Sequence, residues 1–373
     1  MIDLFYYFIF PLLALLITIT CINAIFGPFL NWKKTVSDRP FVSVLIPARN
    51  EEKKIKTCLE SLLRQDYHSF EIHVLDDEST DHTAEIVKKM AGRDTKIHFH
   101  SGKALPAGWT GKNWACHQLS QHARGEIFIF TDADNRYEPQ AITRTIGWIQ
   151  QYHLGMLSVF PQQITYTFFE KLIVPIVDLI LYSLLPLWLT YYARSPHAAA
   201  ANGQWIAFRR EVYEKIGGHQ AVSNKIVEDV ELSRLTKRSG IKILTEAGTS
   251  MIYGHMYYSM REVWEGFSKN FFGLVSYKTT PFLIILASLI MIAIAPYLLL
   301  FTSRFFTVAL VAIILNLLWR SILTIRFKHS FLYGVILHPL SIMLAVLIGL
   351  NSLRQVKRGQ IIWKNRSILM RNK

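Results

Sequence analysis

Cysteine is scarce in this chain, and acidic residues are outnumbered. The three cysteines, Cys21, Cys58 and Cys116, form no CxxC or Cys/His spacing, so they provide neither a disulfide framework nor a zinc site. The 27 acidic residues stand against 41 Lys and Arg, which gives a net charge of +14. No nucleic-acid recognition motif and no basic stripe with interleaved aromatic residues accompanies this excess, so we expect no nucleic-acid partner.

Charge is absent from residues 4–26, LFYYFIFPLLALLITITCINAIF, a run long enough to cross a hydrocarbon core of about 30 Å. The preceding Met1-Ile2-Asp3 lacks the basic n-region of a signal peptide. We therefore expect a retained transmembrane anchor within residues 1–32. Lys33 and Lys34 follow it directly, and the positive-inside rule then places the next part of the chain in the cytoplasm.

Three more apolar blocks lie near the C-terminus, at about 282–303, 305–323 and 331–350, and they define a predicted membrane region over 281–351. A strongly basic tail, 352–373, follows them. Three full crossings after the anchor would place this tail outside, whereas its Lys and Arg content favours the cytoplasm. We expect one of the first two blocks to be re-entrant or interfacial. Basic residues beside anionic headgroups also account for the positive net charge.

The middle of the chain, 40–280, alternates strand and helix patterns. Short β-branched or aromatic runs at 41–47, 71–77, 96–100 and 126–130 predict strands, and amphipathic segments between them predict helices. This alternation predicts an α/β domain with a mostly parallel sheet and helices on both faces. In such sheets ligands bind outside the carboxyl ends of the strands.

Acidic side chains stand at those predicted strand ends. FTDADN brings Asp132 and Asp134 to the end of one strand, and Asp77 ends another. Adjacent carboxylates repel each other, and a hard divalent cation relieves the repulsion because Mg²⁺ and Mn²⁺ prefer oxygen ligands and bind substrate phosphates as well. The alternative is that the two acids cap the next helix or face solvent.

The segments PARNEE, LDDESTD and FTDADN occur in this order, each at the end of a predicted strand, and together they resemble the family-2 glycosyltransferases of the GT-A fold. The resemblance implies a Rossmann-like domain that binds a nucleotide-sugar and Mg²⁺ or Mn²⁺. Asp134 would be the direct metal ligand and Asp132 would lie by the ribose and the metal. The remaining nucleotide-binding residues would be Pro47, Ala48, Arg49 and Glu51 at the ribose and base, Asp77 at the base, and Lys112 of GKNWA, for which a solvated loop lysine is the alternative.

The segment KIVEDVELSRLTKRSG begins a charged helix with Glu228 and Asp229. Acids in a first helical turn are also favoured by the helix dipole alone. The family resemblance assigns Asp229 as the catalytic base, with Glu228 beside it. An inverting transfer needs such a base to take the proton of the acceptor hydroxyl, and it needs no covalent sugar intermediate.

Two further segments match the resemblance. Asn202, Gly203 and Gln204 correspond to a turn beside the donor sugar and acceptor, although an ordinary turn between elements is the alternative. His255 corresponds to a late histidine that binds the metal in some GT-A enzymes, although a lone histidine is usually structural.

Residues 171–193 are nearly uncharged and of spanning length, yet they lie between the two acidic motifs. If they crossed the membrane, Asp134 and Asp229 would lie on opposite sides, so we expect an interfacial or re-entrant segment. MREVWEGFSKN predicts a surface helix whose Arg261 and Trp264 suit the headgroup level of a bilayer. Both features indicate a lipid acceptor.

The polymerase motif Gln-x-x-Arg-Trp is replaced here by Met260-Arg261-Glu262-Val263-Trp264, which counts against a polysaccharide synthase. The tail RGQIIWKNRSI resembles the end of carotenoid, hopanoid and ceramide glycosyltransferases, with Asn365 in place of the usual glycine. The sequence thus predicts a bacterial multi-pass membrane enzyme that transfers a sugar, from a UDP-sugar, to a lipid at the cytoplasmic face. A transferase that loads a polyprenyl-phosphate carrier and a catalytically silent membrane scaffold are the alternatives.

Overall fold

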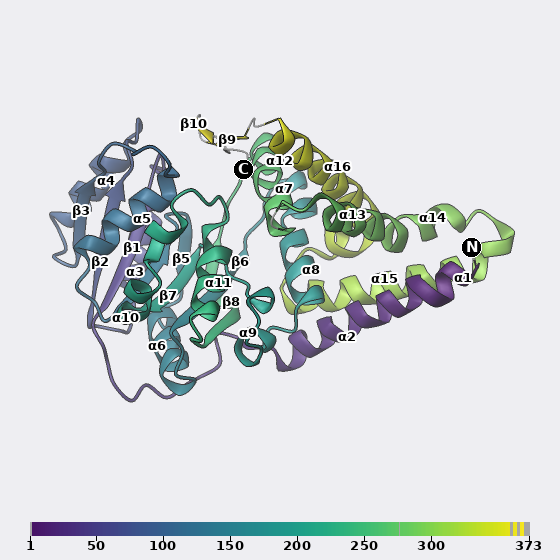
Figure 1. The fold of residues 1–373 in the computed structure, drawn as a ribbon, viewed down its shortest axis with the longest axis horizontal. Helices are drawn as coiled ribbons and strands as arrows, with labels where there is room; N and C mark the ends of the chain where they lie inside the picture. The colour runs from purple at the N-terminus through teal and green to yellow at the C-terminus, as the bar shows by residue number, and fades with distance from the viewer. Residues whose placement is uncertain (1, 276, 359–360, 364–365, 369–373) are drawn as a thin grey trace. The chain divides into compact units, whose positions relative to one another are not determined.

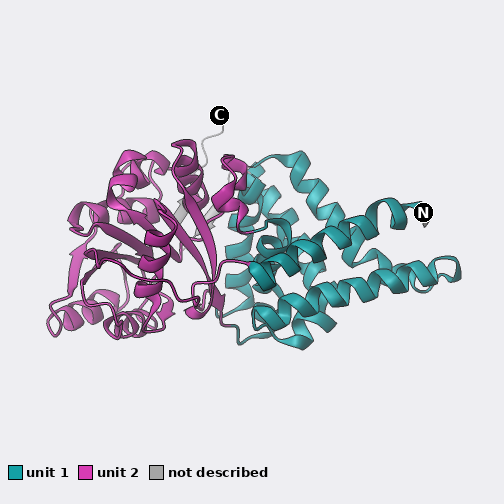
Figure 2. Ribbon diagram, turned by 90° about the horizontal axis from the view of Figure 1, so that it is seen from below, with its two compact units in different colours: residues 1–26, 165–186, 257–373 teal, residues 27–164, 187–256 magenta. Residues whose placement is uncertain are grey.

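The computed structural model describes residues 2–275, 277–358, 361–363 and 366–368 (Figure 1). It divides into two compact units, which Figure 2 colours separately. Unit 1 is made of three stretches, 1–26, 165–186 and 257–373, and unit 2 of two, 27–164 and 187–256. Nine of the 22 residues of the predicted basic tail, 352–373, lie outside the described residues, and Asn365 is one of them.

Unit 2 is built on a mixed eight-stranded sheet with the order β3-β2-β1-β4-β7-β6-β8-β5. Strands β3, β2, β1 and β4 are parallel to one another, as is β6 to β8, whereas β7 and β5 run antiparallel to their neighbours. The α/β prediction is therefore confirmed, with a mixed sheet. The strands are β1 (Val42–Ala48), β2 (Phe70–Asp76), β3 (Ile97–Ser101), β4 (Ile127–Thr131), β5 (Asn135–Tyr137), β6 (Met156–Gln163), β7 (Trp205–Arg209) and β8 (Ile243–Gly254).

Alternating side chains along these strands feed two hydrophobic cores, one on each face of the sheet. Val44 and Ile46 of β1 pack into one core, whereas Leu45 packs into the other. The helices that cover the faces are α3 (Ile55–Leu63), α4 (Thr83–Ala91), α5 (Gly111–His122), α6 (Ala141–Gln151), α9 (Leu189–Tyr192), α10 (Arg210–Lys215) and α11 (Glu228–Arg238), with short turns η2 (Pro196–Ala198) and η3 (Gly218–Val222).

Unit 1 is helical, and among its described residues four helices are long and apolar enough to cross a membrane: 5–26, 279–299, 303–326 and 338–357. Large apolar side chains such as Leu298 and Ile325 are exposed on them, as expected of a lipid-facing surface. The elements are α1 (Ile2–Leu4), η1 (Phe5–Ile9), α2 (Phe10–Phe26), α7 (Phe168–Ile173), α8 (Pro175–Leu184), α12 (Met260–Asn270), η4 (Phe271–Val275), α13 (Thr279–Ala293), α14 (Ala295–Leu299), η5 (Ser303–Phe305), α15 (Phe306–Arg326), η6 (Leu332–Ile336), α16 (His338–Lys357), β9 (Ile361–Trp363) and β10 (Arg366–Ile368).

The apolar segment 171–193 is not one helix. It forms the end of α7, then α8, which ends at Leu184, and then α9, and the boundary between the units falls after Pro186. Within unit 1, buried polar contacts tie α8 to α2 and α15: Asn23 Nδ2 donates to the Tyr182 carbonyl at 2.9 Å, and Trp319 Nε1 donates to Ser183 Oγ at 2.9 Å. The assignment of this segment to the bilayer interface stays a prediction.

Candidate functional site

The two aspartates of the DAD motif follow β4 directly, at its carboxyl end, and each faces a lysine. Asp132 Oδ1 lies 2.8 Å from Lys112 Nζ. Asp134 Oδ2 lies 3.7 Å from Lys54 Nζ, which also lies 3.8 Å from Glu51. The two carboxylates, both partly buried, offer the hard oxygen ligands that Mg²⁺ and Mn²⁺ prefer. The residues present therefore fit a divalent ion at this position.

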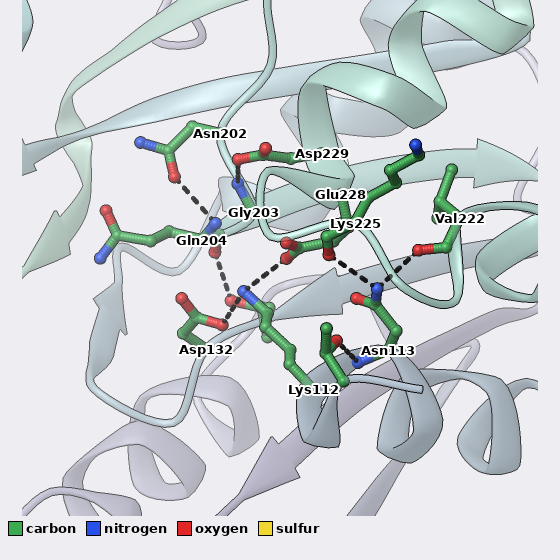
Figure 3. Close-up of polar contacts among 12 residues, drawn as sticks. Lys112, Asn113, Asp132, Asn202, Gly203, Gln204, Val222, Lys225, Glu228 and Asp229 are labelled. Carbon is green, nitrogen blue, oxygen red and sulfur yellow. Dashed lines mark hydrogen bonds and ion pairs between the residues drawn. The ribbon is translucent and has the colours of Figure 1, made fainter. Parts of the chain in front are cut away.

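Lys112 connects the DAD motif to the Glu-Asp motif (Figure 3). It lies in the first turn of α5, which begins where the Thr110 side chain accepts a hydrogen bond from the Asn113 amide. Its Nζ lies 3.3 Å from Glu228 Oε1 as well as against Asp132. Although burial opposes its charge, these two carboxylates hold the pKa of Lys112 well above its usual range. Lys112 is therefore a fixed positive charge between the two acidic motifs.

Asp229 is held by two backbone amides at the start of α11. Its Oδ2 accepts from Gly203 N at 2.9 Å and its Oδ1 from Val230 N at 2.8 Å. Desolvation by the surrounding protein and the adjacent Glu228 carboxylate raise the pKa of Asp229 to about 7, against the opposing effect of Lys112. A carboxylate with this pKa can accept a proton near neutral pH.

The turn 202–204 forms the opposite wall of this site. A Cβ added at Gly203 would come within 2.8 Å of Lys112 Nζ and 3.4 Å of Glu228 Oε1, so only glycine leaves these groups in place. Asn202 Oδ1 accepts from Gln204 N at 2.9 Å and shapes the turn. The Gln204 side chain is buried and bonded to Asn135 and Gln163, so it supports the turn from behind.

Pro47 and Ala48, at the carboxyl end of β1, lie at the same end of the sheet as the DAD motif. Pro47 lines a cleft together with Lys112, Asp132, Gly203 and Glu228. Ala48 is buried, and its carbonyl accepts from Asp77 N at 2.8 Å.

Arg49 links the ends of β1 and β2. Its Nη1 donates to the Asp77 carbonyl at 2.6 Å and lies 3.9 Å from Asp77 Oδ2. The same nitrogen lies 3.6 Å from Glu78 Oε2. The structure thus brings most of the predicted nucleotide-site residues together at the carboxyl ends of the parallel strands.

The last three predicted residues are placed differently from one another. His255 follows Gly254, which pairs with Asn135 in the antiparallel β5 and β8 strands, so His255 is next in register to Asp134. Arg261 and Trp264 lie on α12 of unit 1, outside the unit that holds the acids. Arg261 is exposed and pairs with Glu265 at 2.7 Å, and Trp264 lines an apolar depression with Phe169 and Leu344.

Sequence reasoning missed two residues that hold the site together. Asn113 is fully buried, and its Nδ2 donates to the carbonyls of Val222, Ser223 and Lys225, just before α11. Lys54 lies between Glu51 and Asp134. Both roles depend on contacts with distant segments of the chain. The only local signal is position: Asn113 lies within GKNWA, and Lys54 lies two residues after PARNEE.

A comparison with protein-family models identifies part of the chain. Residues 43–217 match the model described as Glycosyl transferase family 2, so this part of the chain is a family-2 glycosyltransferase domain. The match runs from β1 to the end of α10 and includes the DAD motif, and it supports a transferase.

Curated relatives are named more specifically. The chain is 27% identical over 239 residues to a 4,4'-diaponeurosporenoate glycosyltransferase of Staphylococcus haemolyticus (strain JCSC1435), covering 61% of this chain and 60% of the relative. It is 28% identical over 240 residues to the enzyme of the same name from Staphylococcus aureus (strain USA300), with the same coverage. The matched part thus spans about 60% of the length of these relatives.

A solved structure shares the fold. The mannosyltransferase PcManGT from Pyrobaculum calidifontis, in complex with GDP-Man and Mn²⁺, superposes with a TM-score of 0.51 at 17% identity. The superposition covers 90% of this chain and 99% of that structure. It places unit 2 among the GT-A folds.

Proposed function

We propose that this protein is an inverting glycosyltransferase that moves a sugar from a nucleotide-sugar, a UDP-sugar in the first instance, to a hydrophobic lipid at the cytoplasmic face of the membrane. The observation that carries the proposal is the arrangement of Asp229, with its pKa of about 7, beside Gly203 and Glu228 and next to the Lys112–Asp132 pair. This arrangement combines a base with a fixed positive charge in one cleft.

Each part of the site has a chemical task in this reaction. Asp229 takes the proton of the acceptor hydroxyl as its oxygen attacks the anomeric carbon, and the nucleoside diphosphate leaves from the opposite side. Lys112 supplies positive charge beside Asp132, where the diphosphate of the donor is expected. Asp132 and Asp134 would hold a divalent ion, and the ion would stabilise the charge of the leaving diphosphate.

A hydrophobic acceptor is supported by unit 1 and by the relatives. Unit 1 exposes large apolar side chains along helices of membrane-spanning length. The curated relatives carry a carotenoid-derived acid, diaponeurosporenoate, in their names. Together these observations favour an acceptor that resides in the bilayer.

The direct test uses purified full-length protein in detergent with Mn²⁺, a panel of UDP- and GDP-sugars, and a total lipid extract that is included or omitted. Nucleotide release and new glycolipids are read by mass spectrometry. We expect lipid-dependent turnover with one donor. Transfer only to added polyprenyl phosphate would identify the carrier-loading alternative. Silence with every donor, together with no nucleotide binding, would favour the scaffold.

The metal assignment has its own test. Asp134→Ala removes the proposed direct ligand, so we expect Mn²⁺-dependent turnover to fall by at least about 100-fold, because a bound ion contributes several kcal/mol of transition-state stabilisation. Glu60→Ala on α3 removes one half-exposed carboxylate outside the site and is the matched control. Unchanged turnover in Asp134→Ala would remove the metal assignment.

A further inference from the structure

A second group of potential metal ligands lies at the edge of the unit 2 sheet, on strands β2 and β3. Glu71 and His73 belong to β2, and His98 belongs to the edge strand β3, directly opposite His73 in the parallel register. One ligand atom from each residue lies within 4.8 Å of the others. Among the described residues this is the only group of three or more His, Cys, Asp or Glu side chains with that spacing. None of its members belongs to the proposed transferase site.

Strand alternation explains why these side chains gather. Ile72 and Val74 of β2 pack into one hydrophobic core, so Glu71 and His73 point to the other face of the sheet. His98 and His100 of β3 point to that same face, since Ile97 and Phe99 belong to the first core. A face that would normally be filled by apolar residues is therefore filled by a carboxylate and imidazole rings.

The ligand atoms approach one another closely. His73 Nε2 lies 3.1 Å from Glu71 Oε1, and His98 Nε2 lies 3.9 Å from Glu71 Oε2. The Glu71 and His73 side chains are 3% and 5% exposed. His73 Nε2 is buried, and its contact with Glu71 lies outside ideal hydrogen-bond geometry. A buried imidazole nitrogen that faces a carboxylate and a second imidazole is in position to act as a metal ligand.

Neighbouring side chains and a backbone amide hold the His73 ring and the Glu71 carboxylate in place. His73 Nδ1 lies 2.8 Å from His100 Nε2, which fixes the ring with Nε2 toward Glu71. Glu71 Oε1 accepts from Ser43 Oγ at 2.7 Å and from Arg124 N at 2.9 Å, which fixes the carboxylate. Hydrogen bonds of this kind to the outer atoms of metal ligands orient those ligands.

We propose that Glu71, His73 and His98 form a second metal site, for a divalent transition ion of the Zn²⁺ type. Two imidazoles and one carboxylate are a ligand set that Zn²⁺ binds, with water as the fourth ligand. Ligands of a tetrahedral Zn²⁺ lie about 3.3 Å apart, since the bonds to nitrogen and oxygen are about 2.0–2.2 Å long. The ligand atoms lie within 4.8 Å of one another, so they must move closer together to hold the ion.

The two groups that must move are the exposed ones. The rings of His73 and His98 are stacked at 25°, so His98 must turn its ring to direct Nε2 at the ion, and its side chain is 37% exposed. The Arg124 guanidinium lies 2.9 Å from Glu71 Oε2 and must give way to the ion, and its side chain is 72% exposed. In the absence of the ion, Arg124 supplies the positive charge that Glu71 requires.

This site differs in chemistry and purpose from the carboxylate pair of the DAD motif. Imidazole nitrogen favours Zn²⁺ over Mg²⁺ and Mn²⁺, whereas Asp132 and Asp134 offer only oxygen. A bound ion would join the edge strand β3 to β2. Its expected effect is to stabilise unit 2, because an ion that binds only the folded state raises the melting temperature. The inference does not depend on the proposed transferase activity.

The test is Zn²⁺ titration of chelator-stripped, full-length protein in detergent by calorimetry. It is run in the Asp134→Ala background, so that the DAD motif does not contribute. We expect one Zn²⁺ per chain, and we expect His98→Gln to weaken binding by at least about 100-fold. His98 is partly exposed, so this variant should fold. His82→Gln, at the exposed histidine that precedes the neighbouring helix α4, is the matched control and should bind like the Asp134→Ala parent.

Two independent readouts accompany the titration. Co²⁺ should give a visible absorption spectrum of imidazole coordination in the parent and not in His98→Gln. Zn²⁺ should raise the melting temperature of the parent and of His82→Gln only. Equal Zn²⁺ affinity in His98→Gln and His82→Gln, or no Zn²⁺ binding by the parent, would overturn the proposal.

Discussion

Asp229 is the single side chain on which the proposed chemistry depends most. Asp229→Asn keeps a side chain of nearly the same shape but cannot accept the acceptor proton. We expect kcat to fall by about 10²–10⁴-fold, the usual contribution of a general base. Donor binding should change little, as measured by calorimetry with the nucleotide-sugar. Glu231→Gln, two residues further along α11, is the control. Loss of donor binding together with turnover would mean that Asp229 is structural.

The pKa of the same residue predicts the pH profile. Since desolvation and Glu228 raise the pKa of Asp229 to about 7, the ionised base is lost as the pH falls below 7. We expect kcat/KM to fall about tenfold per pH unit on that side and to level off above it. Glu228→Gln removes the neighbouring negative charge, so the midpoint should move to lower pH. A profile that is flat from pH 5.5 to 8 in the parent would exclude Asp229 as the base.

At the scale of elements, Asn113 joins the start of α5 to the segment that precedes α11. Asn113→Ala removes three hydrogen bonds, to the carbonyls of Val222, Ser223 and Lys225; the first two keep a backbone donor, Lys225 N and Thr110 N. Each lost hydrogen bond costs about 0.5–1.5 kcal/mol, so we expect a clear drop in melting temperature and weaker turnover. Gln121→Ala, at an exposed position of the same helix, should alter neither. A variant as stable as the parent would show that these bonds are replaced by water.

The same scale shows what local patterns can predict. The runs at 41–47, 71–77, 96–100 and 126–130 each became a strand displaced by one residue: β1, β3 and β4 begin and end one residue later than the run, and β2 one residue earlier. The insertion of β7 between β4 and β6 could not be predicted, because antiparallel pairing of remote strands leaves no periodic trace. Asp132 and Asp134 were found from their position at a strand end. Lys54 was missed because its contact with Asp134 requires the folded chain.

At the scale of the whole molecule, unit 1 is assembled from three separate stretches of the sequence. Hydropathy located each apolar block, but it carries no information about which blocks pack together. Inside unit 1, hydrogen bonds join helices that are far apart in the sequence. Thr20 of α2 and Ser183 of α8 both accept from Trp319 Nε1 of α15, at 3.1 and 2.9 Å. Such bonds between helices are the expected attachment in an apolar surrounding.

This assembly predicts the result of removing residues 1–30. Three further helices of spanning length remain, at 279–299, 303–326 and 338–357, so we expect the truncated protein to stay in the membrane fraction after a carbonate wash. It should also melt at a lower temperature, because Asn23 no longer donates to the Tyr182 and Leu185 carbonyls and Trp319 loses Thr20. Full-length Asn23→Ala separates the two effects, since it removes the Asn23 bonds and keeps every helix. A truncated protein that is fully soluble would mean that the C-terminal helices do not insert.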